Sequence, residues 1–139
     1  MQIAITRFPG FCKMVERAIT IAESAAEEFP DKKVYTLGRL AHNDRVSERL
    51  SKKGISVALS PEELTAGDVL VISAHGAPPS VYEASAKRGI IVRDATCPNI
   101  VKIHDTIKKY GEKGYFVLLI GDEKHREIVG DSGWARDVA

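Results

Sequence analysis

Short runs rich in apolar and β-branched residues alternate along this chain with segments that have the 3.6-residue periodicity of amphipathic helices. The runs that resemble strands are Gln2–Thr6, Val34–Leu37, Ile55–Leu59, Asp68–Ser73, Ile90–Val92 and Tyr115–Ile120. The segments that resemble helices are Lys13–Phe29, Asn43–Lys53, Pro79–Arg88 and Pro98–Tyr110, with a further helix start at Ser60. This alternation predicts an α/β fold in which a parallel sheet carries helices on both faces.

The length of 139 residues suits one domain, or one domain and part of another. Residues 1–96 contain five of the predicted strands, and we expect them to form a complete first α/β lobe. Residues 97–139 contain one helix, one strand and a loop-like tail that ends at Asp137–Ala139. A single strand is not a stable unit, so it either joins the first sheet or begins a second α/β unit that is incomplete in this chain. We favour the incomplete second unit.

Charge and hydropathy exclude several classes of function. Lys and Arg number 20 against 19 Asp and Glu, a formal net charge of +1, which argues against a basic nucleic-acid-binding face. The longest apolar stretch, Phe116–Ile120, is far shorter than the ~20 residues that span a membrane. No signal peptide is visible after Met1, so we expect a cytoplasmic location. In that reducing compartment the two cysteines are expected to be free thiols.

Reactive side chains follow the predicted strands, at the points where those strands end. They are Cys12, His42, His75, Cys97 and the pair His125 and Glu127. Because the carboxyl ends of parallel strands meet at one edge of a sheet, we expect these side chains to share one site. Each also has an ordinary structural explanation, such as a buried thiol or a capping histidine. His104, in the middle of a predicted helix, is expected to have a core or surface role.

The residue types suggest what such a site would bind. Cys12 and Cys97 lie at predicted helix starts, where the helix dipole stabilises a thiolate, and thiolates select iron–sulfur clusters or zinc. The two are too far apart in the chain to form a local ligand motif. Three histidines suit an oxyanion such as a phosphate group, and Glu127 is a candidate proton donor. Two Cys and two His could instead complete a tetrahedral zinc site.

The ordered set of motifs resembles the 4-hydroxy-3-methylbut-2-enyl diphosphate reductases, the LytB-type iron–sulfur enzymes that end the non-mevalonate isoprenoid pathway. The similarity covers the N-terminal portion of that family. The matching segments are Gly10-Phe11-Cys12, Val15–Ile19, Ala41-His42-Asn43, Ser73–Gly76, Asp94–Pro98, Lys102-Ile103-His104 and His125-Arg126-Glu127.

The resemblance implies a three-lobed α/β protein around a [4Fe-4S] cluster that three cysteines hold. Cys12 and Cys97 match two of these ligands, and the third protein ligand is not present in this chain. His42, His75 and His125 match the histidines that contact the substrate diphosphate, and Glu127 matches the acid that delivers protons. The implied reaction is the reductive dehydroxylation of 4-hydroxy-3-methylbut-2-enyl diphosphate to isopentenyl and dimethylallyl diphosphates. A ferredoxin or flavodoxin would donate the electrons.

The chain also departs from the family pattern. Lys13-Met14 stands where small residues usually follow the first cysteine, and Arg126 stands where a proline usually separates the last His and Glu. Two cysteines alone do not complete the family's cluster. The chain is therefore expected to be a fragment of a longer enzyme, a short relative that gains ligands from another chain, such as a homo-oligomer, or a cluster-free protein. The alternative function is a non-catalytic α/β module that binds a diphosphate or a partner without redox chemistry.

Overall fold

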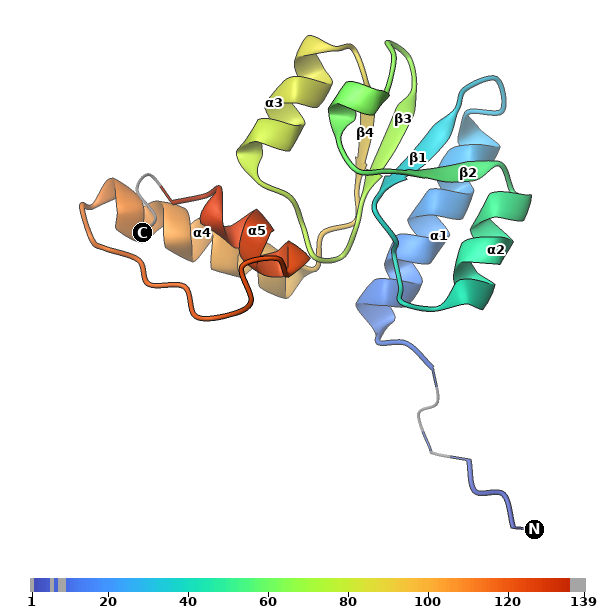
Figure 1. The fold of residues 1–139 in the computed structure, drawn as a ribbon, viewed down its shortest axis with the longest axis horizontal. Helices are drawn as coiled ribbons and strands as arrows, with labels where there is room; N and C mark the ends of the chain where they lie inside the picture. Colours follow the sequence, from blue (N-terminus) through green and yellow to red (C-terminus); the bar gives the residue numbers. More distant parts are fainter. Residues whose placement is uncertain (1, 6, 8–9, 136–139) are drawn as a thin grey trace.

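A parallel sheet of four strands forms the centre of the computed structural model, which describes residues 2–5, 7 and 10–135 (Figure 1). Its strands are β1 (Val34–Leu37), β2 (Ile55–Ala58), β3 (Val69–Ile72) and β4 (Ile91–Asp94). They lie in the order β2-β1-β3-β4, and every neighbouring pair is parallel. The predicted α/β class is therefore confirmed.

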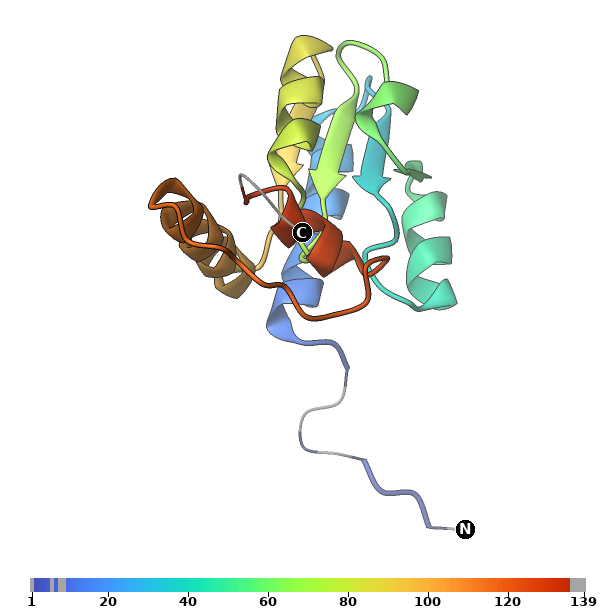
Figure 2. The same ribbon diagram turned by 60° about the vertical axis from the view of Figure 1, so that its left-hand side comes forward.

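Helices cover both faces of this sheet. They are α1 (Lys13–Glu28), α2 (Asp44–Lys52), the 3-10 turn η1 (Pro61–Glu63), α3 (Pro79–Lys87), α4 (Pro98–Glu112) and α5 (Arg126–Ser132). Helices α1 and α2 pack on one face, and η1 and α3 pack on the other. Helices α4 and α5 lie next to each other beyond the carboxyl ends of the strands (Figure 2). None of the helices in the described part of the chain is long and apolar enough to cross a membrane.

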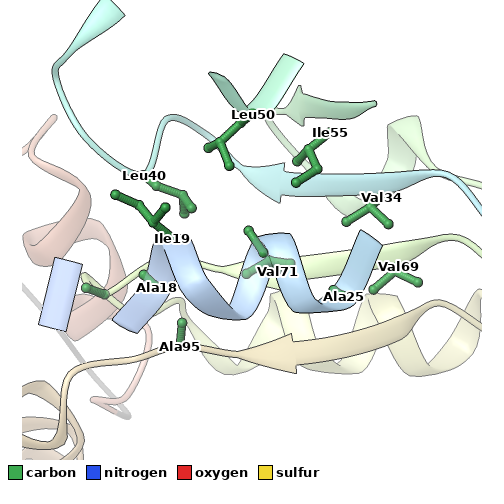
Figure 3. Close-up of a cluster of buried hydrophobic side chains, with 12 residues drawn as sticks. Ala18, Ile19, Ala25, Val34, Leu40, Leu50, Ile55, Val69, Val71 and Ala95 are labelled. Carbon is green, nitrogen blue, oxygen red and sulfur yellow. The ribbon is translucent and has the colours of Figure 1, made fainter. Parts of the chain in front are cut away.

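The larger core lies between α1 and the sheet (Figure 3). Alanines at positions 18, 22 and 25 are almost fully buried, and their small side chains let the helix approach the strands closely. Val69 and Val71 of β3 point to this face, whereas Leu70 and Ile72 point to the second core beneath α3 and η1. This alternation explains why β3 is apolar at every position, since both faces of a central parallel strand are covered.

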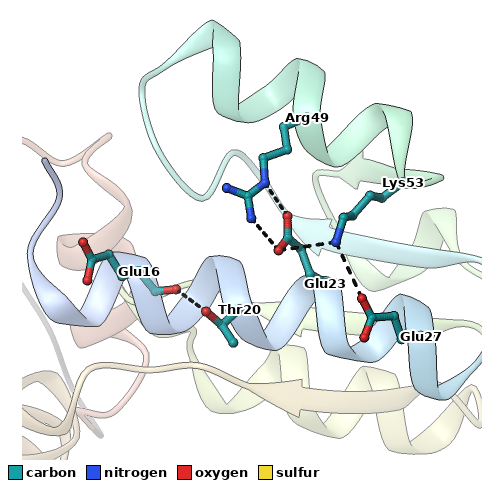
Figure 4. Close-up of polar contacts among 6 residues, drawn as sticks. All are labelled: Glu16, Thr20, Glu23, Glu27, Arg49 and Lys53. Atoms are coloured by element: carbon teal, nitrogen blue, oxygen red, sulfur yellow. Dashed lines mark hydrogen bonds and ion pairs between the residues drawn. The ribbon is translucent and has the colours of Figure 1, made fainter.

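A charged cluster holds α2 against α1 (Figure 4). Arg49 donates from Nε and Nη2 to the two carboxylate oxygens of Glu23, each at 2.6 Å. Lys53 Nζ lies 3.5 Å from Glu23 and 3.6 Å from Glu27. The hydrogen bond from Arg49 is the main cause that lowers the pKa of Glu23. The contact links α1 to α2, the helix that follows the loop of residues 38–43.

Two predicted strands are wrong within the described residues. Gln2–Ile5 is not a strand, and the side chains of Ile3 and Ile5 are 76% and 81% exposed; Thr6 lies outside the described residues. Tyr115–Ile120 is also irregular and largely exposed. Both runs have the apolar pattern of a strand, but neither pairs with the four-stranded sheet. A strand forms only where a neighbour satisfies its backbone N–H and C=O groups.

The segment predicted as a loop-like tail contains a helix, α5, and its last residues, Asp137–Ala139, lie outside the described residues. Nothing in the composition of Arg126–Ser132 marks a strong helix, because the segment is short and includes Gly130. Packing forms it: Gly130 and Asp131 are buried against the rest of the chain. The predicted division at residue 96 remains a prediction.

Candidate functional site

The strand order creates a switch point between β1 and β3. The chain passes from β1 to β2 on one side and then returns to β3 on the other side of β1. Loops that leave the carboxyl ends of two such strands diverge and leave a crevice, which is where α/β proteins bind ligands. The two loops are residues 38–43 and residues 73–78, and they carry His42 and His75.

The loop after β3 holds His75 in a half-buried position. Ser73 Oγ lies 3.4 Å from His75 Nδ1. Gly76 has a positive φ of 76°, and a Cβ there would lie 2.7 Å from His104 Cε1 of α4. The loop therefore passes so close to α4 that only glycine fits at this position.

Helix α5 brings His125 to His75. His125 is the N-cap of α5, and its ring centroid lies 5.9 Å from that of His75 in an edge-to-face arrangement. The backbone N–H of Glu127 donates to His125 Nδ1 at 3.4 Å. A neutral ring whose Nδ1 accepts a hydrogen bond carries its proton on Nε2. His125 therefore has an N–H donor available for an anion.

The electrostatics of His75 show which charged groups surround it. Burial lowers the pKa of His75 below its ordinary value of 6.5. The neighbouring groups His125, Arg126 and His42 lower this pKa further, and the carboxylate of Glu127 raises it. All four groups thus act on one imidazole although they come from two distant parts of the chain. An anion bound among them would counter the repulsion between the cationic groups.

Both cysteines are free and cap the N-termini of α1 and α4. These two helices begin on the carboxyl side of the sheet (Figure 1). Cys12 is the exposed N-cap of α1, and Cys97 is the half-buried N-cap of α4. The backbone N–H of Cys97 donates to Ala74 O at 3.0 Å, beside His75. Arg17 Nη1 lies 3.5 Å from Thr96 O and connects α1 to the residue that precedes Cys97. The two helix starts and the histidine loops therefore lie at the same end of the sheet.

Asp94 shapes the turn that presents Cys97. Its Oδ1 accepts from the backbone N–H of Thr96 at 2.8 Å, and its Oδ2 accepts from the Tyr82 hydroxyl at 3.0 Å. Because both carboxylate oxygens are used, this residue has a structural role at the strand end. Sequence reasoning did not assign it one.

Thiols are the ligand type that iron–sulfur clusters use, but two thiols are fewer ligands than such a cluster needs. In the described ranges no group of three or more His, Cys, Asp and Glu side chains is arranged to hold a metal ion. The sequence contains two cysteines, so the chain offers two thiolate ligands. The tetrahedral zinc site of two Cys and two His is not formed by the residues that the structure describes.

Sequence reasoning also underestimated two features of the site. Arg126 Nη1 donates to Leu37 O at 2.7 Å, and the sequence signalled it only as a departure from a family pattern. His104, for which a core or a surface role was expected, is buried, and its Nε2 lies 3.1 Å from Asp131 Oδ1. No local motif marks that pair.

The chain is a doubly wound α/β lobe with imidazoles at its switch point and thiols at the adjacent helix starts. The sequence profile described as "LytB protein" matches residues 3–139, so the chain belongs to the LytB family.

Its relatives include proteins named 4-hydroxy-3-methylbut-2-enyl diphosphate reductase. That of Thermoanaerobacter sp. (strain X514) is 42% identical over the whole of this chain and 49% of its own length. That of Aquifex aeolicus (strain VF5) is 39% identical over 98% of this chain and 46% of its own length. The chain spans about half the length of the curated relatives it matches.

Solved structures give the same result. A structure of the reductase described as the terminal enzyme of the non-mevalonate pathway aligns with a TM-score of 0.79 at 39% identity, over 90% of this chain and 44% of that chain. The Plasmodium falciparum reductase aligns with a TM-score of 0.85 at 34% identity, over 91% of this chain and 39% of that chain. These alignments confirm the expected family and its N-terminal portion.

Proposed function

We propose that this chain is the part of a 4-hydroxy-3-methylbut-2-enyl diphosphate reductase that binds the diphosphate group and supplies two cluster ligands. The observation that carries the proposal is the meeting of His75 and His125, whose ring centroids lie 5.9 Å apart at the switch point. In this proposal His42 is the third diphosphate ligand, on the neighbouring loop. The reaction served is the reductive dehydroxylation that gives isopentenyl and dimethylallyl diphosphates.

The imidazoles bind the anion in complementary ways. His125 donates its Nε2–H to a phosphoryl oxygen, because its Nδ1 already accepts from the backbone of Glu127. His75 is held towards its neutral form by burial and by the surrounding positive charge, so an incoming diphosphate stabilises its protonated form. Exposed His42 reaches the same anion from the loop after β1. Hydrogen bonds between charged partners are about twice as strong as neutral ones.

Cys12 and Cys97 are the residues of this chain that would hold a [4Fe-4S] cluster. When bound, the cluster supplies electrons and a Lewis-acidic iron. Cys12 is exposed at the start of α1, and Cys97 is fixed by its backbone bond to Ala74. A third protein ligand comes from the remainder of a longer enzyme or from a second chain, and a ferredoxin or flavodoxin is the electron donor.

Glu127 is the proposed proton donor. It is half-buried in the first turn of α5, two residues after His125, and its charge acts on His75. In this proposal the carboxyl group of Glu127 lies beside the bound diphosphate. Its role is to deliver protons as the hydroxyl group of the substrate leaves.

Calorimetric titration with inorganic pyrophosphate tests the diphosphate site without needing the cluster. His42→Ala and His75→Ala should each weaken binding by roughly 10- to 100-fold, since losing one charge-assisted contact costs roughly 1.5–3 kcal/mol. Lys52→Ala removes an exposed cation at the opposite end of α2 and should leave the affinity unchanged. Equal affinity in both histidine variants and the wild type would refute the assignment.

A second candidate is a diphosphate-binding module without redox chemistry, which the presence of only two thiol donors favours. Anaerobic reconstitution with iron and sulfide separates the two functions. The reductase proposal expects bound iron and absorbance near 400 nm once the remaining ligands are provided. A colourless protein that still binds pyrophosphate supports the module.

A further inference from the structure

We propose that Arg126 is a positioning residue that ties the N-terminus of α5 to the carboxyl end of β1, and so sets His125 and Glu127 relative to the loop that carries His42. The inference rests on the proposed function, because the groups it positions are the proposed anion ligands and proton donor. Arg126 lies between His125 and Glu127 in sequence, so its side chain and the two functional residues leave the same helical turn.

The tether is a single long-range hydrogen bond. Arg126 Nη1 donates to the backbone carbonyl of Leu37 at 2.7 Å in a half-buried setting. Leu37 is the last residue of β1, five residues before His42. The bond therefore joins the two sides of the crevice directly, across 89 residues of sequence.

The guanidinium group of Arg126 lies directly against Gly38. It has a φ of +64°, and a Cβ there would lie 1.7–1.9 Å from Nη1, Cζ and Nη2 of Arg126. The guanidinium can occupy this position only because residue 38 has no side chain. Gly38 is itself fixed, since its N–H donates to Ala58 O at 2.7 Å and its carbonyl accepts from Thr36 Oγ1 at 2.8 Å.

The surroundings of the Arg126 side chain indicate that it positions neighbouring residues and does not simply fill space in a core. A cavity of about 400 Å³ adjoins the tether, and Leu37, Gly76, Lys124 and Arg126 are among its lining residues. Because there is open space beside the side chain, a different residue at position 126 does not have to overpack the fold. The positive charge of Arg126 also lies close enough to His75 to lower the pKa of that ring.

Two glycines make a matched pair for testing the tether. Gly54 has a φ of +77° and nothing within 4 Å of an added Cβ, so Gly54→Ala introduces the same backbone strain as Gly38→Ala without touching Arg126. The test set is Gly38→Ala, Gly54→Ala, Arg126→Met, Arg126→Lys and the double variant of Gly38→Ala with Arg126→Met. Arg126→Lys keeps the positive charge and removes the planar donor group.

Pyrophosphate affinity is the first measurement, at a temperature where all variants are folded. Gly38→Ala, Arg126→Met and Arg126→Lys should each weaken binding about fivefold, and Gly54→Ala should not. The double variant should bind pyrophosphate no more weakly than whichever single variant binds it more weakly, because both changes break the same contact. Wild-type affinity in Arg126→Lys, or additive losses in the double variant, would overturn the proposal.

Histidine NMR spectra give a second measurement that needs no ligand. The cross-peaks between the His75 and His125 rings should be lost in Gly38→Ala and in Arg126→Met and kept in Gly54→Ala. If pyrophosphate does not bind to the wild type, the proposed function fails, while these cross-peaks still decide whether Arg126 positions the rings. Cross-peaks that persist in all variants would refute the positioning role.

Discussion

The buried pair of His104 and Asp131 offers a sharp test of how α4 and α5 hold the site together. The two residues are 3% and 5% exposed, and His104 Nε2 lies 3.1 Å from Asp131 Oδ1. The contact is electrostatic, because within the described residues neither atom has a hydrogen-bond partner of good geometry. The His104 ring also stacks on Trp134, with centroids 4.9 Å apart. Asp131→Leu removes the carboxylate, and Asp131→Asn is the conservative variant that removes only its charge.

The expected loss of stability follows from the neutral form of the histidine. Burial lowers the pKa of His104, so at pH 7.5 the ring is neutral and the contact is not a full ion pair. Asp131→Leu replaces the carboxylate beside a buried imidazole nitrogen with an apolar group, which costs about 1–3 kcal/mol. Burial also raises the pKa of Asp131, which means that burying its charge is unfavourable. Removing this charge in Asp131→Leu therefore offsets part of the loss of stability. We expect a net loss of about 1–2 kcal/mol at pH 7.5, or roughly 0.5–1 M in the urea midpoint.

The pH dependence has a definite sign. A histidine whose pKa is lowered by folding adds stability above its unfolded value, and this is lost as the pH falls through the folded value. The charge of Asp131 raises the pKa of His104, as do Asp94 and Asp105, so Asp131→Asn lowers it further. The raised pKa of Asp131, to which Glu127 contributes, adds stability at low pH that is lost as the pH rises. Both effects make Asp131→Asn less stable relative to the wild type at pH 5.5 than at pH 7.5.

Urea unfolding at pH 7.5 and pH 5.5 checks both statements, with Glu48→Gln as an exposed control on α2. If Asp131→Leu unfolds at the wild-type midpoint, the contact contributes nothing. If the difference between Asp131→Asn and the wild type is the same at both pH values, the linkage between the two groups is wrong.

Three further predictions follow from the site. Cys12→Ser and Cys97→Ser should each lower iron retention after anaerobic reconstitution and leave the helix content unchanged. Iron analysis and circular dichroism measure these two quantities. Full iron content in both variants would exclude the two cysteines as ligands. Burial raises the pKa of Tyr82 to about 12, and Asp94 is a further cause. Asp94→Asn should therefore lower the Tyr82 pKa, which absorbance at 295 nm measures. An unchanged titration would argue against the contact between Tyr82 and Asp94. Pyrophosphate affinity should increase from pH 8 to pH 6.5, because His75 gains a proton when the anion binds; His75→Ala should flatten this dependence.

Much of the fold could be predicted from the sequence because local patterns dictate it. Val34–Leu37 matches β1 at both ends, and Pro79 marks the start of α3, where its missing N–H costs nothing. The predictions for Gln2–Ile5 and Tyr115–Ile120 failed for a common reason. An apolar pattern indicates which faces a strand would bury, but a strand exists only if another strand lies beside it, and residue periodicity contains no information about partners.

The predicted grouping of the site residues rests in part on a sixth strand that the structure does not contain. His42 and His75 follow strands that exist, so the switch point explains their proximity. His125 and Glu127 were expected at the end of a sixth strand, which the structure does not contain; α5 places them instead. Cys12 likewise does not follow a strand within the described residues, and α1 places it.

Helix α5 and the residues that follow it contact the loop after β3, and this packing accompanies the approach of His125 to His75. Trp134 Nε1 donates to Ala77 O at 3.1 Å, and a Cβ on Gly130 would lie 3.5 Å from His75 O. On its other side the same loop touches His104 of α4, which in turn contacts Asp131 of α5. The loop is thus held between two helices that are joined to each other by a buried polar pair. Residues separated by 27 positions, with no shared motif, make that joint, so only the folded chain could reveal it.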